Sequence, residues 1–189
     1  MRIIAGKFRG RNLKSPPSLE VRPTSDRLRE TLFNVIAPRI EGARFLDLCA
    51  GSGAVGIEAL SRGALQSTFV DRSRKMCALV KSNLDLCRLE EHESEIVQSE
   101  AYDYLRGVIG KRRVSSEPWD IVFFDPPYAM DYIQILEAFG AQASILLAEN
   151  ALIVVEHHHK KILPAEVDHI RRIRVLKQGD SALSFYKTE

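Results

Sequence analysis

Short apolar runs alternate with segments of helical periodicity along most of the chain. The runs lack polar alternation and predict parallel strands that are buried on both faces, at residues 45–48, 67–71, 96–98, 121–124 and 151–156. Between them, apolar residues recur every three or four positions, which predicts helices near residues 53–62, 73–87, 101–108 and 132–139. Strands that alternate with helices in this way are typical of a doubly wound, Rossmann-like α/β sheet.

Weaker patterns precede and follow this alternation. Residues 1–13 alternate weakly around two glycines and predict a small β-hairpin, and residues 24–36 predict a helix. Two late strands, at residues 170–176 and 182–186, flank a Gly-Asp turn and are expected to pair antiparallel. We therefore expect a seven-stranded, mostly parallel α/β sheet with one antiparallel strand.

The composition excludes several classes of protein. A hydrophobic fraction of 45% and a charged fraction of 28% are those of a globular protein in water. No apolar run approaches the roughly 20 residues that span a bilayer, and the N-terminus lacks the apolar core of a signal peptide. The cysteines, Cys49, Cys77 and Cys87, are too few and wrongly spaced for a disulfide framework or a zinc site. We expect a monomeric protein of the reducing cytoplasm.

Charge is distributed unevenly near the N-terminus. The first 19 residues contain no acid, but they contain the basic residues Arg2, Lys7, Arg9, Arg11 and Lys14. Such asymmetry fits a surface that meets phosphates, and it fits a mobile, solvated terminus equally well. Residues 1–20 are accordingly predicted to be a basic hairpin extension of a main domain at 21–189. The start of the predicted helix, where the helix dipole favours anions, carries Arg22, Arg27 and Arg29.

A glycine-rich turn, Gly51-Ser52-Gly53, follows the first strand directly. Glycine lets the backbone turn sharply and lets a ligand approach closer than a Cβ atom would permit. The spacing that continues to Gly56 also satisfies the fingerprint of NAD enzymes, so spacing alone does not identify the ligand. Asp47, just before the turn, favours a cationic group such as the ammonium of a methionine moiety, and it would repel a pyrophosphate. Alternatively, neighbouring backbone N–H groups satisfy its carboxylate.

Two further acids follow the next strands. Asp71 ends the second strand about twenty residues after the glycine turn, where an acid accepts hydrogen bonds from ribose hydroxyls. Its alternative role is that of an ordinary helix N-cap. Glu100, after the third strand, is a weaker candidate for contact near an adenine, and Ser99-Glu100 could equally cap the next helix.

The sequence Asp125-Pro126-Pro127-Tyr128, at the end of the fourth strand, is the most specific chemical signal. Two prolines stiffen the backbone and remove N–H donors, which leaves a rigid turn of acceptors beside an aromatic ring. An exocyclic amino nitrogen is a poor nucleophile because its lone pair is delocalised into the base. If the Asp125 carboxylate and the Pro126 carbonyl each accept one of its hydrogens, the lone pair turns toward an electrophile. Tyr128 can stack on a base that is flipped out of its helix.

The run His157-His158-His159 suggests a metal site at first sight. Adjacent residues at a strand end point in different directions, so three of them rarely share one ligand sphere. A solvated basic loop, continued by Lys160 and Lys161, is the preferred interpretation, and no metal is expected. Cys49 has no histidine near it in the sequence and is interpreted as a small buried residue.

With these residues in place, the chain resembles the class I S-adenosylmethionine-dependent methyltransferases, and within them the RsmD-type family. The likeness covers nearly the whole chain and rests on Met1-Arg2-Ile3-Ile4-Ala5-Gly6, Gly10, Arg22-Pro23-Thr24, Asp26, Arg27, Arg29, Glu30, Phe33, Asn34, the glycine turn, Asp125–Tyr128 and Gly179-Asp180-Ser181. The Asp-Pro-Pro-Tyr motif alone is shared with adenine- and cytosine-N-methyltransferases, and the block at 22–24 narrows the match. One departure is visible, because the family usually has Gly-Asp-Ala where this chain has Ser99-Glu100-Ala101.

The resemblance implies transfer of a methyl group from S-adenosylmethionine to the N2 amino group of a guanine in small-subunit ribosomal RNA, either free or in an assembly particle. The implied catalytic residues are Asp125, Pro126, Pro127 and Tyr128. The implied cofactor-binding residues are Asp47, Cys49, Ala50, Gly51, Gly53, Asp71, Arg72, Glu100, Ala101 and Asp125. The implied RNA-binding residues are Arg2, Lys7, Arg9, Arg11, Arg22, Thr24, Arg27 and Arg29.

Competing functions remain open. An adenine-N6 methyltransferase of DNA or RNA would use the same motif, and guanine is favoured by resemblance alone. A methyltransferase that acts on a glutamine amide would more often carry Asn-Pro-Pro-Tyr, because an amide needs a side chain that both donates and accepts. A nicotinamide-dependent oxidoreductase gives no reason for the motif, and a non-enzymatic RNA-binding module leaves both the motif and the glycine turn without a role.

Overall fold

The computed structural model of the chain describes residues 1–16, 26–112, 117–126 and 130–188. Four residues that the sequence predicts in the functional site lie outside the described residues, namely Arg22, Thr24, Pro127 and Tyr128. Most of the predicted polar loop between the third helix and the fourth strand also lies outside them.

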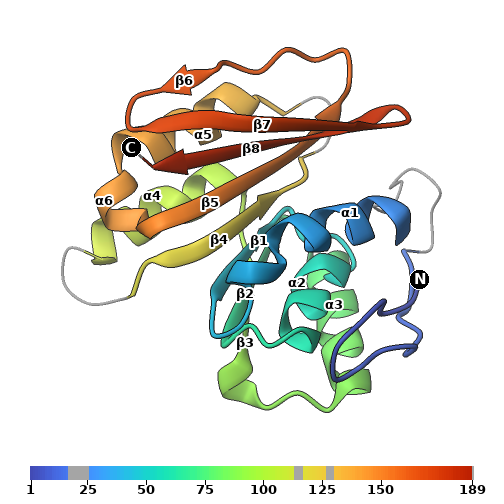
Figure 1. Ribbon diagram of the computed structural model, residues 1–189. Helices are drawn as coiled ribbons and strands as arrows, with labels where there is room; N and C mark the ends of the chain where they lie inside the picture. The colour runs from blue at the N-terminus through green and yellow to red at the C-terminus, as the bar shows by residue number, and fades with distance from the viewer. Residues whose placement is uncertain (17–25, 113–116, 127–129, 189) are drawn as a thin grey trace.

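Within the described residues, one eight-stranded sheet forms the centre of the fold, in the order β3-β2-β1-β4-β5-β8-β7-β6 (Figure 1). The strands are β1 (Arg44–Leu48), β2 (Gln66–Asp71), β3 (Ser94–Gln98), β4 (Trp119–Phe124), β5 (Leu147–His158), β6 (Glu166–Val167), β7 (Ile170–Gln178) and β8 (Ser181–Thr188). Strands β1 to β5 run parallel, whereas β8 runs antiparallel to β5 and β7. The predicted doubly wound α/β class is confirmed.

The C-terminal edge of the sheet differs from the expectation of seven strands with one antiparallel. The short β6 adds an eighth strand and, like β8, runs against β7. A strand of only two residues has no periodic pattern, so the sequence could not reveal β6. Strand β5 begins at Leu147 rather than at Ala151, directly after the short helix α6 (Ala143–Leu146), which was not predicted.

Helices cover both faces of the sheet (Figure 1). One face carries α1 (Asp26–Ile36), α2 (Ala54–Ser61) and α3 (Arg74–Cys87), and the other carries α4 (Ala101–Arg112), α5 (Tyr132–Ala141) and α6; the 3-10 turns are η1 (Ala37–Arg39) and η2 (Glu91–Glu93). In β4, Phe123 packs with the first group of helices and Phe124 with the second. Because both faces are covered, the central strands β4 and β5 contain continuous apolar runs, at residues 121–124 and 151–155. Among the described residues, no helix is long and apolar enough to cross a bilayer.

The first residues of the chain form a compact hairpin on the α2 and α3 side of the molecule. The Ile3 N–H donates to the Arg11 carbonyl at 2.9 Å, and the Leu13 N–H donates to the Met1 carbonyl at 2.8 Å. The apolar side chains of Ile3 and Leu13 are buried in the main core. A hairpin with a single antiparallel bridge, between Arg2 and Asn12, therefore stands where a β-hairpin was predicted, and it packs against the domain.

A buried carboxylate holds this hairpin to α2. Glu58 is 0% exposed, and its two oxygens accept the Ile4 N–H at 2.7 Å and the Ala5 N–H at 2.9 Å. Arg62, one helical turn later, donates its Nε–H to the same carboxylate at 2.8 Å. The close approach requires glycine at position 6, where φ is +82° and an added Cβ would lie 1.8 Å from the Ser61 carbonyl oxygen.

Candidate active site

The described residues of the predicted catalytic and cofactor-binding sets lie at the carboxyl edge of the parallel strands. The register aligns Leu48 of β1 with Val70 of β2 on one side and with Phe124 of β4 on the other. Residues that directly follow these strand ends therefore lie close together although they are far apart in the sequence. In open α/β sheets this edge is where ligands bind.

Cys49 lies at the centre of this edge. Burial raises the pKa of its thiol, and the nearby carboxylates raise it further; they belong to Asp71, Asp125, Asp47 and Glu100. A thiol that is held protonated is a poor nucleophile, which supports its interpretation as a packing residue, although it is half-buried rather than buried. Its φ of 67° is left-handed, a strained conformation for a residue with a Cβ. Carboxylates at the ends of four strands thus lie near Cys49, which makes this edge of the sheet favourable for a cation.

Two of these acids fix the glycine turn. Asp71 accepts the Gly51 N–H through Oδ2 at 2.9 Å and the Ser73 N–H through Oδ1 at 2.8 Å. Asp47 is 2% exposed and accepts the Gly56 N–H at 2.9 Å. Both carboxylates therefore satisfy backbone N–H groups, which is the alternative that the sequence left open for Asp47. Their contacts with a cofactor remain predictions.

The glycines of the turn serve two different purposes. Gly53 precedes α2 with a φ of 75°, the left-handed conformation that lets the chain turn from strand to helix. Gly56 lies within α2, where an added Cβ would lie 2.4 Å from the Phe69 ring and 2.6 Å from the Ser67 hydroxyl. The third glycine thus allows α2 to pack closely on β2, so its presence does not favour NAD over another ligand.

Arg72, directly after β2, lies near Glu100, which follows β3. The Arg72 guanidinium lies 3.6 Å from Glu100, and both side chains are exposed. An exposed ion pair of this kind contributes only about 0–1 kcal/mol, so it can open to a ligand at little cost. The Ser99 N–H donates to the Asp71 carbonyl at 3.1 Å, which holds the two strand ends side by side, and Ala101 is buried at the start of α4.

Asp125 lies on the other side of β1. Its N–H donates to the Leu48 carbonyl at 3.3 Å, which fixes Asp125, the first residue of the predicted acceptor turn (residues 125–128), to the strand that leads to the glycine turn. Asp125 is half-buried, whereas Pro126 is buried. Asp125 is thus held near Cys49 and the other three acids, and it is not fully buried.

Asp47 makes the stability of the ligand-free protein depend on pH. Burial raises the pKa of its carboxyl from 3.8 to about 7, against the effect of the Gly56 N–H bond. Between these two values the folded state holds a proton that the unfolded state has lost. The free energy of unfolding should therefore fall as the pH rises from about 4 to about 7. In urea unfolding across this range, Asp47→Asn should reduce the fall, and parallel curves for both proteins would contradict the assignment.

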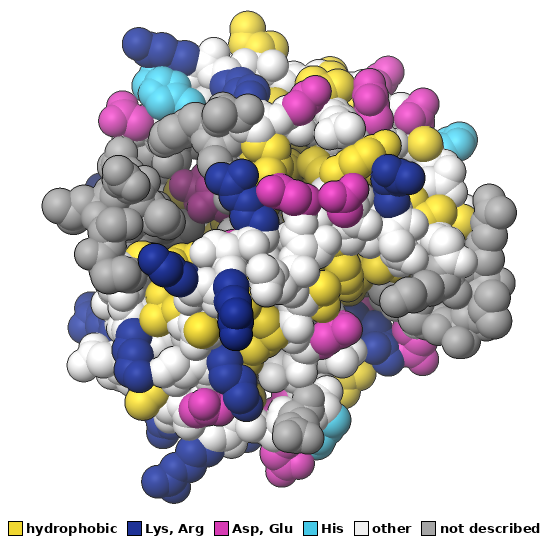
Figure 2. Space-filling view, turned by 180° about the vertical axis from the view of Figure 1, so that it is seen from behind, with side chains coloured by type: hydrophobic (Ala, Val, Ile, Leu, Met, Phe, Trp, Pro, Cys, Tyr) yellow, Lys and Arg dark blue, Asp and Glu magenta, His cyan; other side chains and the backbone are white. Residues whose placement is uncertain are grey.

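Most predicted RNA contacts lie on the surface. The side chains of Arg2, Lys7, Arg9, Arg11 and Arg27 are exposed. Figure 2 shows Lys and Arg side chains gathered on the lower left of the face seen from behind, the side on which the hairpin and α3 lie.

Arg29 differs from the other arginines of this set. It is 0% exposed, and its Nη2 donates to the Arg2 carbonyl and to Asp26, each at 2.7 Å. Burial lowers the pKa of its guanidinium, and the Asp26 carboxylate opposes that shift. In this position Arg29 links α1 to the hairpin and does not face RNA.

Sequence analysis missed the buried polar residues that join the hairpin to the site. Asn83 of α3 is 0% exposed, and its Nδ2 donates to the Ser52 carbonyl at 2.9 Å and to the Lys14 carbonyl at 3.1 Å. One amide thus connects the hairpin to the glycine turn. The sequence signal that could have revealed Asn83 is that a polar residue lies on the apolar side of a predicted helix. Glu58 lies on the apolar side of α2 in the same way.

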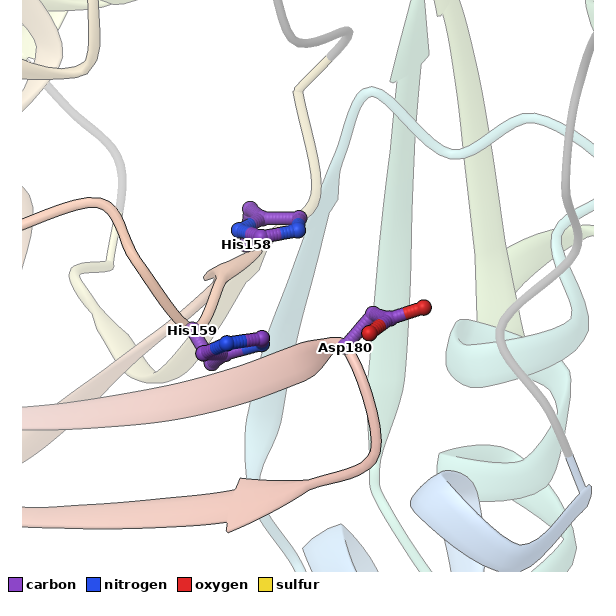
Figure 3. A group of neighbouring side chains, drawn as sticks. All are labelled: His158, His159 and Asp180. Carbon is purple, nitrogen blue, oxygen red and sulfur yellow. The ribbon is translucent and has the colours of Figure 1, made fainter.

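The histidine run separates into one buried and two half-buried side chains. His157 is not solvated, because it is buried with its Nε2 2.8 Å from the Ser184 hydroxyl, and burial lowers the pKa of its imidazole. His158 and His159 meet Asp180 with ligand atoms within 4.8 Å of one another (Figure 3). Their rings stack at a centroid distance of 4.6 Å and an angle of 27°. Metal-binding lone pairs lie in the ring plane, so stacked rings do not point at a common ion.

Known proteins share this fold and sequence over nearly their full length. The profile of a family described as Conserved hypothetical protein 95 matches residues 1–187. The Escherichia coli K12 protein named ribosomal RNA small subunit methyltransferase D is 38% identical over 193 aligned positions, which cover 100% of this chain and 90% of the relative. The solved structure of Escherichia coli yhhF has a TM-score of 0.83 at 34% identity, with 100% and 98% of the two chains covered. A Thermus structure, TTHA0928, has a TM-score of 0.80 at 32% identity and covers 98% of each chain. The chain therefore belongs to the Conserved hypothetical protein 95 family, as an RsmD-type methyltransferase that uses S-adenosylmethionine.

Proposed function

We propose that this chain methylates the exocyclic N2 amino group of a guanine in small-subunit ribosomal RNA. The observation that carries the proposal is the position of Asp125, whose backbone is fixed to Leu48 beside a cluster of acids. The curated relative from Escherichia coli is named for small-subunit ribosomal RNA, which supports the substrate class. Guanine rather than adenine is proposed from the family resemblance.

The acidic edge fits the proposed cofactor. S-adenosylmethionine supplies a methyl group on a positively charged sulfur. Asp47 would face its ammonium, Asp71 its ribose hydroxyls and Glu100 its adenine. The carboxylates that surround Cys49 favour such a cation and would repel the pyrophosphate of NAD. This donor set therefore fits a sulfonium cofactor better than a dinucleotide.

Asp125 and Pro126 would activate the acceptor. The Asp125 carboxylate and the Pro126 carbonyl accept the two amino hydrogens of the base, which turns the nitrogen lone pair away from the ring. The carboxylate also stabilises the positive charge that develops on this nitrogen, and a charge already held in place needs no reorganisation. Fixed alignment of the two reactants contributes up to roughly 7–11 kcal/mol to the lowering of the barrier.

The basic hairpin would bind the RNA. We propose that residues 1–20 act as an extension of a methyltransferase domain at 21–189, with Arg2, Lys7, Arg9 and Arg11 facing phosphates. Their exposure supports this role, and so does the buried connection from the hairpin to the glycine turn through Asn83. Arg27 would add a contact at the start of α1, together with Arg22 and Thr24. A monomer acting on free RNA or on an assembly particle in the cytoplasm is the expected form.

The nucleotide that receives the methyl group can be identified directly. The chain is incubated with S-adenosylmethionine that carries a labelled methyl group and, separately, with naked small-subunit RNA, assembled small subunits and duplex DNA. Mass spectrometry of the digested nucleosides should find label in N2-methylguanosine from one of the RNA samples. Label in N6-methyladenosine, or label in DNA alone, would overturn the proposed specificity.

A further inference from the structure

The loop between β5 and β6 begins at the edge of the sheet where Asp125 lies. In the parallel pair of β4 and β5, Phe124 is in register with Val155, so Asp125 and Glu156 both come directly after that pair. Strand β5 continues to His158, and the chain then turns. The loop therefore starts just beyond the residue that is proposed to bind the acceptor base.

The conformation of this loop presents two lysines and an isoleucine. The Lys161 N–H donates to the His158 carbonyl at 2.8 Å, and the Lys160 N–H donates to the His158 Nδ1 at 3.1 Å. This turn leaves Lys160 exposed and Ile162 91% exposed. A large apolar side chain left almost entirely in water directly after two lysines is a feature of contact surfaces.

Contacts on both sides hold the loop in place. The Lys161 Nζ lies 3.5 Å from the ring centroid of Tyr132, the first residue of the helix that follows the acceptor turn. The His159 N–H donates to the Asp180 carbonyl at 2.8 Å, and Figure 3 shows His158 and His159 beside the turn that carries Asp180. These contacts join the β5–β6 loop and the β7–β8 turn into one surface, the acceptor rim, which comprises residues 158–162 and 178–180.

Two lysines distinguish the acceptor rim from the acids at the ends of β1, β2 and β3. The ends of β1, β2 and β3 carry Asp47, Asp71 and Glu100, which repel a phosphate backbone. On the acceptor rim, Lys160 and Lys161 stand beside the acids Glu156 and Asp180. Glu156 accepts a hydrogen bond from the Ser181 hydroxyl at 3.2 Å. In the sheet order, the ends of β1, β2 and β3 lie on one side of β4 and the acceptor rim lies on the other, so its lysines stand away from these three acids.

We propose that the acceptor rim binds the RNA strand next to the methylated nucleotide, with Lys160 and Lys161 on phosphates and Ile162 against a neighbouring base. The inference rests on the proposed RNA substrate and adds a second contact surface to the N-terminal hairpin. The rings of His158 and His159 stack on each other at the start of this loop, and both are half-buried.

Salt-dependent binding tests this surface with a matched control. The double variant Lys160→Ala/Lys161→Ala is compared with Arg39→Ala/Lys187→Ala, which removes the same charge from the opposite edge. Arg39 contacts the Asn150 carbonyl, and Lys187 is in register with Leu152. Binding of a fluorescent transcript of small-subunit ribosomal RNA is measured by anisotropy over a salt series, and cofactor affinity is measured by calorimetry with S-adenosylhomocysteine.

The loop variant should bind RNA more weakly, with a salt slope smaller by about 1.4–1.8 units, because each phosphate contact contributes about 0.7–0.9. Ile162→Ser should weaken binding without changing the slope. Cofactor affinity should be unchanged in every variant, and the control should keep the wild-type slope. Wild-type affinity and slope in the loop variant would overturn the inference. A wild-type chain that neither binds nor methylates this RNA would instead overturn the proposed function, and the inference with it.

Discussion

Asp125→Ala should abolish methyl transfer while the variant still binds the cofactor. The variant loses both an acceptor for the amino group and the charge that stabilises the developing positive nitrogen. Removal of one pre-positioned polar group at a reacting centre costs about 10²–10³ in rate, and Asp125 is proposed to supply two such effects, so a fall of at least about 10³ is expected. Transfer to RNA is measured with labelled S-adenosylmethionine, and cofactor affinity by calorimetry.

Two further variants sharpen this test. Asp125→Asn keeps the shape and one acceptor oxygen but loses the charge, so its rate should fall between those of the wild type and Asp125→Ala. Asp131→Ala removes an exposed acid that caps α5 by accepting the Ile133 N–H at 2.9 Å. That variant should lose about 1 kcal/mol of stability and keep its activity. Normal turnover by Asp125→Ala would contradict the role given to the acceptor turn.

Glu58→Ala should destabilise the protein by about 3–5 kcal/mol, because it leaves the Arg62 guanidinium partly buried without its partner carboxylate. It also leaves the Ile4 and Ala5 N–H groups without their acceptor. The hairpin should then detach before the sheet unfolds. Urea denaturation measures the loss of stability, and limited trypsin digestion measures access to Lys7 and Arg9.

A second ion pair of the same spacing provides the control for Glu58. Lys81 and Asp85 pair at 3.3 Å on α3, with both side chains well exposed. Because an exposed helix pair contributes only about 0.3–0.5 kcal/mol, Asp85→Ala should change stability little and leave the hairpin protected. Equal effects of the two substitutions would show that Glu58 does not anchor the hairpin.

The sequence by itself determined the fold class and the type of reaction, which is methyl transfer from S-adenosylmethionine. Strands covered on both faces are mostly apolar, so residues 121–124 of β4 and 151–155 of β5 were visible as continuous apolar runs. The glycine turn and the motif at Asp125 were visible because each needs particular residues in consecutive positions. The family resemblance rested on the same local features.

Tertiary structure alone decided how the polar residues are used. Arg29 and Arg27 are two positions apart in a helix that begins at Asp26, yet one is buried and the other exposed, because only one side of α1 faces the hairpin. His157 and His158 likewise differ because successive strand residues point to opposite faces. The hairpin N–H groups that Glu58 accepts are 54 and 53 positions away, and the two carbonyls that Asn83 binds are 31 and 69 positions away, so no local pattern indicates them. Long-range hydrogen bonds depend on which helices and strands pack together, and so does the side of each element that is buried. The order of the strands in the sheet fixes this packing.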